Sequence, residues 1–186
     1  MPHIPHSATR DAHILTFEEA MEGKSTAYDR EKWIYVPDFY SEYRYILGTR
    51  GKNPLIAVGI NPSTAEPDNL DNTLKSVERI AHSNGYDSFI MFNVYAQRAT
   101  DPDLMEKEFN PALHRENMKA FDYILSLSER PSIWAAWGTI IKKRKYLPLC
   151  VADMIKLGEE HHARWYTAGA RSKSGGHPHH PLYLRK

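Results

Sequence analysis

Apolar runs alternate along the chain with segments of helical periodicity, and this alternation predicts an α/β fold. Apolar stretches rich in β-branched or aromatic residues indicate strands at residues 43–47, 55–60, 88–94, 132–137 and 164–168. Apolar residues spaced three and four apart indicate helices at residues 72–84, 111–127 and 139–157, the last with a break at Pro148. Strands that alternate with helices form parallel sheets with helices on both faces.

The length of 186 residues predicts one domain, at residues 31–186, preceded by a polar N-terminal extension at residues 1–30. No apolar run is long enough to cross a membrane, and no signal peptide is evident. Cys150 is the only cysteine, which favours a reducing, cytoplasmic location. We expect a monomer without a membrane partner.

The formal net charge of +1 gives no sign of general nucleic-acid affinity, so any DNA contact must come from a local basic patch. The one dense basic cluster is residues 142–145, where Lys142 and Lys143 are candidate phosphate contacts. The alternative, which explains the cluster more readily, is that these residues form the solvated face of a helix.

Polar residues follow three of the predicted strands. In an open α/β sheet, ligands bind beyond the carboxyl ends of the strands. The first strand runs into Asn61, which Pro62 holds in an extended conformation. The candidate site residues at the three strand ends are Gly59, Ile60, Asn61, Pro62, Ser63 and Thr64, then Asn93, Arg98 and Thr100, then Trp137.

Several of these polar residues have a structural alternative. Asp68 and Asp71 precede a predicted helix, where carboxylates cap the helix, but they are equally candidates for catalysis. Arg98 forms either a salt bridge within its loop or a contact to phosphate or to a substituent of the base. The C-terminal histidines lack the Cys or carboxylate partners of a zinc site, so we expect no metal and no cofactor.

A long series of motifs resembles the family called domain of unknown function 1643. The motifs cover the chain from about Tyr43 to the C-terminus and include Gly59–Ala65, Asp71–Thr73, Asn93–Pro102, Ala136–Gly138 and His180–Leu184. This resemblance implies no particular chemistry.

A shorter set of motifs is similar to the uracil-DNA glycosylase superfamily. Gly59-Ile60-Asn61-Pro62 resembles its water-activating motif, and His180-Pro181-Leu182 resembles its His-Pro loop. The resemblance implies a uracil-DNA glycosylase-like three-layer α/β/α sandwich and a hydrolase that excises a base from DNA. It further implies that Asn61 positions water, Asn93 reads the pyrimidine edge, and His180 stabilises the departing base.

One departure from that superfamily concerns the substrate. Uracil-specific members have a bulky tyrosine after the proline of the first motif, whereas this chain has Ser63. A small side chain leaves room at the 5-position, which predicts a 5-substituted pyrimidine as target, including bulky phage-type modified bases and hence a role in antiviral defence.

Two other functions remain open. Few residues follow Leu182, where the superfamily has a helix, so the protein is alternatively a non-catalytic module that senses a nucleotide or modified base. An N-glycosidase that acts on free nucleotides also fits, because it needs no DNA-binding surface. Tyr35, Tyr95 and Trp137 are the candidates for stacking on the base.

Overall fold

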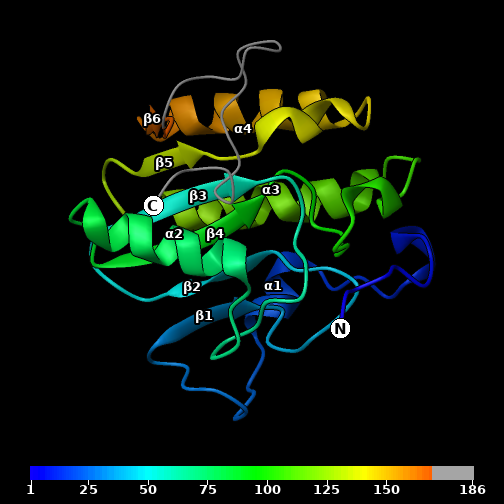
Figure 1. The fold of residues 1–186 in the computed structure, drawn as a ribbon, viewed down its shortest axis with the longest axis horizontal. Helices are drawn as coiled ribbons and strands as arrows, with labels where there is room; N and C mark the ends of the chain where they lie inside the picture. Colours follow the sequence, from blue (N-terminus) through cyan, green and yellow to red (C-terminus); the bar gives the residue numbers. More distant parts are fainter. Residues whose placement is uncertain (169–186) are drawn as a thin grey trace.

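A six-stranded sheet forms the centre of the protein (Figure 1). The structure is a computed structural model and describes residues 1–168. The strands, in spatial order, are β1 (Trp33–Val36), β2 (Ile46–Thr49), β4 (Ser88–Asn93), β3 (Pro54–Gly59), β5 (Ser132–Ala135) and β6 (Arg164–Tyr166). β4, β3, β5 and β6 are parallel, whereas β2 is antiparallel to both β4 and β1. The predicted α/β class with a mostly parallel sheet is therefore confirmed.

Helices cover both faces of this sheet (Figure 1). The α-helices are α1 (Phe17–Met21), α2 (Asn72–Ser83), α3 (Pro111–Leu125) and α4 (Leu147–Glu160). Three short 3-10 helices are η1 (Thr9–Asp11), η2 (Pro102–Leu104) and η3 (Gly138–Lys142). The apolar side chains of α2 pack on one face of the sheet, and those of α1, α3 and α4 pack on the other.

β3 shows why the central strands read as continuous apolar runs. All six of its residues are buried. Ile56 and Val58 pack towards α3 and α4, whereas Leu55 and Ala57 pack towards α2. Successive side chains of a strand point to opposite faces, and both faces are covered here, so no polar alternation is required.

The boundaries of α2 follow from its capping residues. The Asp71 side chain accepts a hydrogen bond of 2.9 Å from the Leu74 backbone N–H, which caps the first turn. Past the last turn, Gly85 has a positive φ of 83°, which glycine adopts without strain. The N-terminus of α2 lies near the end of β3, so Asp71 is placed at the carboxyl edge of the sheet.

The structure differs from the predicted elements in three places. β1 was not predicted, and β2 begins at Ile46, three residues later than expected. The expected helix at residues 139–157 is divided into η3 and α4. Pro148 lies in the first turn of α4, where its missing N–H has no helical partner to lose.

Residues 1–30, expected as a polar extension, make specific contacts with the rest of the protein. Phe17 and Ala20 are buried in the core. The backbone N–H of His3 donates to the Thr100 hydroxyl at 2.8 Å, and the Thr100 N–H donates back to the His3 carbonyl at 3.0 Å. Within residues 1–168, no helix combines the length and the apolar character that crossing a bilayer requires.

Candidate functional site

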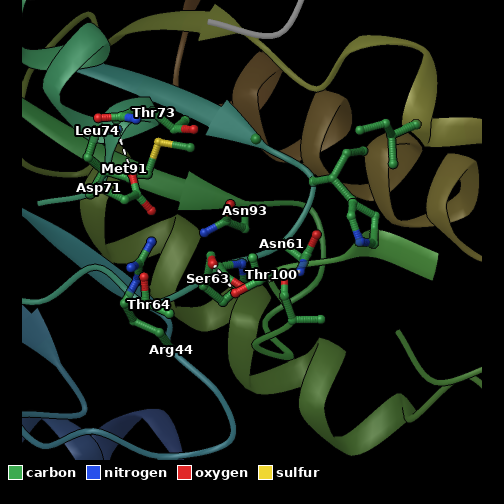
Figure 2. A pocket seen from close by; sticks show the side chains of 17 residues that line it. Arg44, Asn61, Ser63, Thr64, Asp71, Thr73, Leu74, Met91, Asn93 and Thr100 are labelled. Carbon is green, nitrogen blue, oxygen red and sulfur yellow. Dashed lines mark hydrogen bonds between the residues drawn. The ribbon is translucent and has the colours of Figure 1, made fainter. Parts of the chain in front are cut away.

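A cavity of about 390 Å³ opens at the carboxyl ends of β3 and β4 (Figure 2). Gly59 and Asn93 are register partners at the ends of these two strands. The pairing continues beyond them, because Val94 N–H donates to the Gly59 carbonyl at 2.8 Å and Tyr95 N–H to the Ile60 carbonyl at 2.9 Å. The two polar strand ends therefore form one continuous floor, as expected for parallel strands.

Most of the residues predicted for the site line this cavity. They are Gly59, Ile60, Asn61, Pro62, Ser63, Thr64, Asp71, Asn93 and Thr100. Residues that were not predicted also line it, and they are Arg44, Asn72, Thr73, Leu74, Met91, Ala99, Pro102 and Ile140.

Asn93 lies in the middle of the lining residues (Figure 2). Its side chain is 1% exposed, and neither its amide nitrogen nor its amide oxygen has a hydrogen-bond partner. Among residues 1–168 no other side chain has two such atoms. Buried polar groups in folded proteins are nearly always paired, so this orphaned amide makes Asn93 a candidate for contact with a ligand.

Two neighbours hold Asn93 in place. Asn117 of α3 donates from its amide nitrogen to the Asn93 carbonyl at 2.9 Å, which anchors the backbone of this residue. Gly59 lies against the side chain, and a Cβ there would be 3.1 Å from Asn93 Oδ1 and 2.7 Å from the Met91 methyl group. The glycine of the first motif is thus required for close packing.

Asn61 joins the loop after β3 to the loop after β4. Its amide nitrogen donates to the Ala99 carbonyl at 2.8 Å and to the Pro62 carbonyl at 3.1 Å, and Ala99 N–H donates to the Pro62 carbonyl at 2.9 Å. These bonds fix the amide plane. Within the described chain Asn61 Oδ1 has no protein partner, so it can accept a hydrogen bond from water or ligand.

Ser63 and Thr100 form the rim of the cavity. Their hydroxyl oxygens are 2.8 Å apart, so one hydroxyl donates to the other (Figure 2). Because Thr100 also accepts from His3, the N-terminal segment supports this rim. Ser63 presents only a small side chain to the opening.

The two candidate carboxylates occupy different positions. Asp71 lines the cavity, and its Oδ1 caps α2. Asp68 does not line the cavity. It has a φ of 61°, accepts a hydrogen bond of 3.2 Å from Trp33 Nε1, and lies 3.8 Å from the Lys32 ammonium group. Asp71 is therefore the carboxylate that the structure brings to the site.

Two buried arginines lie beneath the loop that follows β3. Arg98 is fully buried and donates to the Ser63 carbonyl and, at 2.9 Å, to the Tyr35 hydroxyl. Its guanidinium also lies 4.0 Å from the centre of the Tyr40 ring. Arg44 is 1% exposed and donates to the Ala65 carbonyl at 3.2 Å, but its Nε has no partner. Arg44, rather than Arg98, lines the cavity.

The sequence carried one signal for Arg44. It is the only charged residue in the predicted strand at residues 43–47, between two tyrosines. A charge in a buried strand requires a partner or a function. Burial and the neighbouring Arg98 lower the pKa of Arg44 to about 9, and the Asp71 carboxylate acts in the opposite direction.

The third strand end contributes less than expected. Trp137 is 8% exposed and does not line the cavity, because its side chain packs in the core, 6.3 Å from Trp165 between ring centres. Ile140 of η3 reaches the cavity instead. Of the three aromatic candidates for stacking, Tyr35 and Tyr95 also lie in the buried core.

The predicted basic patch begins at the last residue of η3 and continues after it. Lys142 and Lys143 are both exposed, and Lys143 forms an ion pair with Asp103. Arg144 donates to the Met105 carbonyl at 2.6 Å and to the Asp103 carbonyl at 2.9 Å. Much of the basic character of this cluster is thus used to hold the loop at residues 103–106.

Two further observations concern metal ligands and His180. Within residues 1–168, no three side chains of His, Cys, Asp or Glu lie close enough together to hold a metal ion. His180, the predicted stabiliser of the departing base, lies outside the described residues.

Comparison with known proteins places the chain in a family without assigning a reaction. Neither the curated proteins nor the solved structures gave a significant match. One family model matches residues 44–182, a segment that contains every residue lining the cavity. The chain belongs to the family described as Protein of unknown function (DUF1643).

Proposed function

We propose that the protein is an N-glycosidase that excises a modified pyrimidine base from DNA. The observation that carries the proposal is the unpaired amide of Asn93 at the cavity floor. A carboxamide offers one acceptor next to one donor, and a pyrimidine edge offers the complementary pair. Enzymes that act on a flipped base read it by such hydrogen bonds. A cavity of about 390 Å³ accommodates a nucleobase with a substituent.

The chemistry requires a nucleophilic water and charge stabilisation. Asn61 Oδ1, whose amide plane is fixed by Ala99, accepts a hydrogen bond from the attacking water. The water oxygen forms a bond to the anomeric carbon while the bond from that carbon to the base nitrogen breaks. Asp71, the carboxylate that lines the cavity, accepts the proton and stabilises the positive charge that develops on the sugar.

The departing base carries away the electron pair of the broken bond. In this proposal His180 donates a hydrogen bond to the base carbonyl oxygen, by resemblance to the His-Pro loop of the uracil-DNA glycosylase superfamily. The three-layer sandwich of that superfamily is part of the proposal, and the helices on both faces of the sheet support it.

The substrate proposal follows from Ser63. Its small side chain lies on the rim, with its hydroxyl turned to Thr100, and leaves room beside the base. A 5-substituted pyrimidine, including a bulky phage-type base, is therefore the proposed target, and antiviral defence the proposed setting.

A free nucleotide is the second candidate substrate. Two residues expected at phosphate groups are occupied within the protein, since Arg98 is fully buried and Lys143 pairs with Asp103. This favours a substrate that needs no extended DNA-binding surface.

A base-release assay tests the proposal. The purified protein is incubated with duplex and single-stranded DNA that carries uracil, mismatched thymine or 5-substituted pyrimidines, and with the corresponding free nucleotides. Released bases are measured by mass spectrometry. We expect release from at least one 5-substituted substrate, and no release from any substrate would contradict an enzymatic function.

Asn61→Ala separates an enzyme from a sensor. The enzyme loses turnover by orders of magnitude, whereas a sensor loses only affinity for its ligand. Lys75→Ala is the control, because it truncates an exposed side chain of α2 that does not line the cavity.

A further inference from the structure

Arg44 is a buried cation without an anionic partner in direct contact. Its side chain is 1% exposed, and no carboxylate of residues 1–168 lies within 4.0 Å of its guanidinium nitrogens. The Ala65 carbonyl accepts one hydrogen bond from it, and Nε has no partner. Burial of a charge is costly unless the charge is paired and hydrogen-bonded, so this position requires an explanation.

Arg98 offers a comparison within the same cluster. It is equally buried, but it donates to the Ser63 carbonyl and the Tyr35 hydroxyl and lies over the Tyr40 ring. Its contacts hold the loop after β3, and it does not line the cavity. The Nε of Arg98 also lacks a partner, but both terminal nitrogens of Arg98 donate within the protein, whereas Arg44 makes a single hydrogen bond. The contacts of Arg98 therefore account for a structural role, and those of Arg44 account for less of its charge.

The cavity carries an excess of positive charge at this end. Among residues 1–168, Arg44 and Asp71 are the only ionisable residues that line it, and Asp71 faces Arg44 (Figure 2). Arg98, close behind Arg44, adds a second positive charge against that one carboxylate. The guanidinium stays charged at neutral pH even with its lowered pKa of about 9. Thr64, beside Arg44, adds a hydroxyl donor.

We propose that Arg44 binds a negatively charged, oxygen-rich group of the ligand, of phosphate or carboxylate chemistry. A guanidinium presents its N–H donors in a planar fork that matches such groups. The group comes either from the nucleotide phosphate or from an acidic substituent on the base. The inference rests on the proposed base pocket and names the class of ligand that the pocket takes.

Titration calorimetry on the full chain tests this inference without requiring base release. One arm compares deoxyuridine 5′-monophosphate with deoxyuridine, and the other compares 5-carboxydeoxyuridine with thymidine. Inorganic phosphate is the minimal probe. We expect the anionic ligand to bind at least tenfold more tightly than its neutral counterpart in one of the two arms, and that arm identifies the source of the charge.

Arg44→Met should abolish this preference, whereas Arg79→Met, which removes the same charge from the exposed face of α2, should retain it. Thr64→Val should reduce the preference severalfold, and it provides a test if Arg44→Met does not fold. Equal binding of anionic and neutral ligands, a preference that survives in Arg44→Met, or an undiminished preference in Thr64→Val would overturn the inference. No binding of any anionic ligand, including phosphate, would also overturn it. Anion preference without base release from any substrate would overturn the glycosidase alone.

Discussion

Two polar clusters in the described part of the chain differ in whether their hydrogen bonds are complete. The Glu106 cluster consists of Thr9, Tyr95, Glu106 and Asn110. The Glu106 carboxylate accepts from Thr9 N–H at 2.7 Å, from the Thr9 hydroxyl at 2.5 Å and from the Tyr95 hydroxyl. Asn110 donates from its backbone N–H to the Tyr95 hydroxyl at 3.0 Å and from its amide to the Thr9 hydroxyl at 2.9 Å.

The cavity at the ends of β3 and β4 has the opposite character. Both amide atoms of Asn93 and the Nε of Arg44 lack partners. A completed network stabilises the fold and attaches the N-terminal residues to it. An incomplete one reduces the free energy of unfolding and persists where a ligand supplies the missing partners. The comparison therefore indicates a structural role for the Glu106 cluster, and the unpaired atoms of the cavity support its proposed binding role.

The largest expected effect is on turnover. Asp71→Asn removes the proposed proton acceptor, and asparagine caps a helix as well as aspartate does. We expect base release to fall by about 100- to 10,000-fold with little change in the melting temperature. Single-turnover kinetics and thermal unfolding measure the two quantities. Unchanged turnover would show that Asp71 only caps α2.

The next effect is on stability. Glu106→Leu leaves the Thr9 N–H, the Thr9 hydroxyl and the Tyr95 hydroxyl without their acceptor. The free energy of unfolding should fall by about 3 kcal/mol, as measured by urea denaturation. The remaining folded protein should retain its affinity for the base. Selective loss of binding at unchanged stability would reverse the distinction between the two clusters.

Asn93→Leu should change stability in the opposite direction. Leucine has a similar size and removes two unpaired polar atoms, so the free energy of unfolding should rise by about 1 kcal/mol. Affinity for the base should fall by about tenfold or more, because one buried hydrogen-bonded edge is lost. The same urea and calorimetry experiments measure both changes. A clear loss of stability would indicate that Asn93 is paired within the free protein.

The smallest effect concerns Cys150, whose buried thiol reports on the fold. Burial raises its pKa to about 12 from 9.0, and the thiolate is the reactive form. Alkylation at pH 8.5 should be slow in the native protein and in Asn93→Leu, and faster in Glu106→Leu and in urea.

Because burial raises the pKa of Cys150 in the native protein, the free energy of unfolding should decrease as the pH rises. The unfolded chain loses the Cys150 proton above about pH 9 while the native protein keeps it, so stability falls as the pH rises from about 9 towards 12. The loss is about 1 kcal/mol at pH 10. Cys150→Ala should lack this component in urea titrations at pH 8 and pH 10, and an equal loss in that variant would contradict the assignment.

Local sequence patterns predicted the part of the fold that surrounds the pocket. β3, β4, α2 and α3 were predicted to within one or two residues at most boundaries, because their apolar periodicity is strong and proline or glycine marks their ends. β1, a strand of four buried apolar residues, was missed. Apart from Arg98, the predicted residues of the first two strand ends do line one cavity, since parallel strands end at the same edge.

The sequence by itself determined the α/β class, the polar strand ends and the cap of α2, all of which depend on neighbours in the chain. Only the tertiary structure decided which polar groups meet at the cavity. It brought Asp71 to the cavity while Asp68 paired with Trp33 and Lys32, and it turned Trp137 into the core. It placed Arg44, from another part of the chain, beneath the loop after β3. Whether a buried polar group finds a hydrogen-bond partner depends on such long-range contacts, and local periodicity does not encode them.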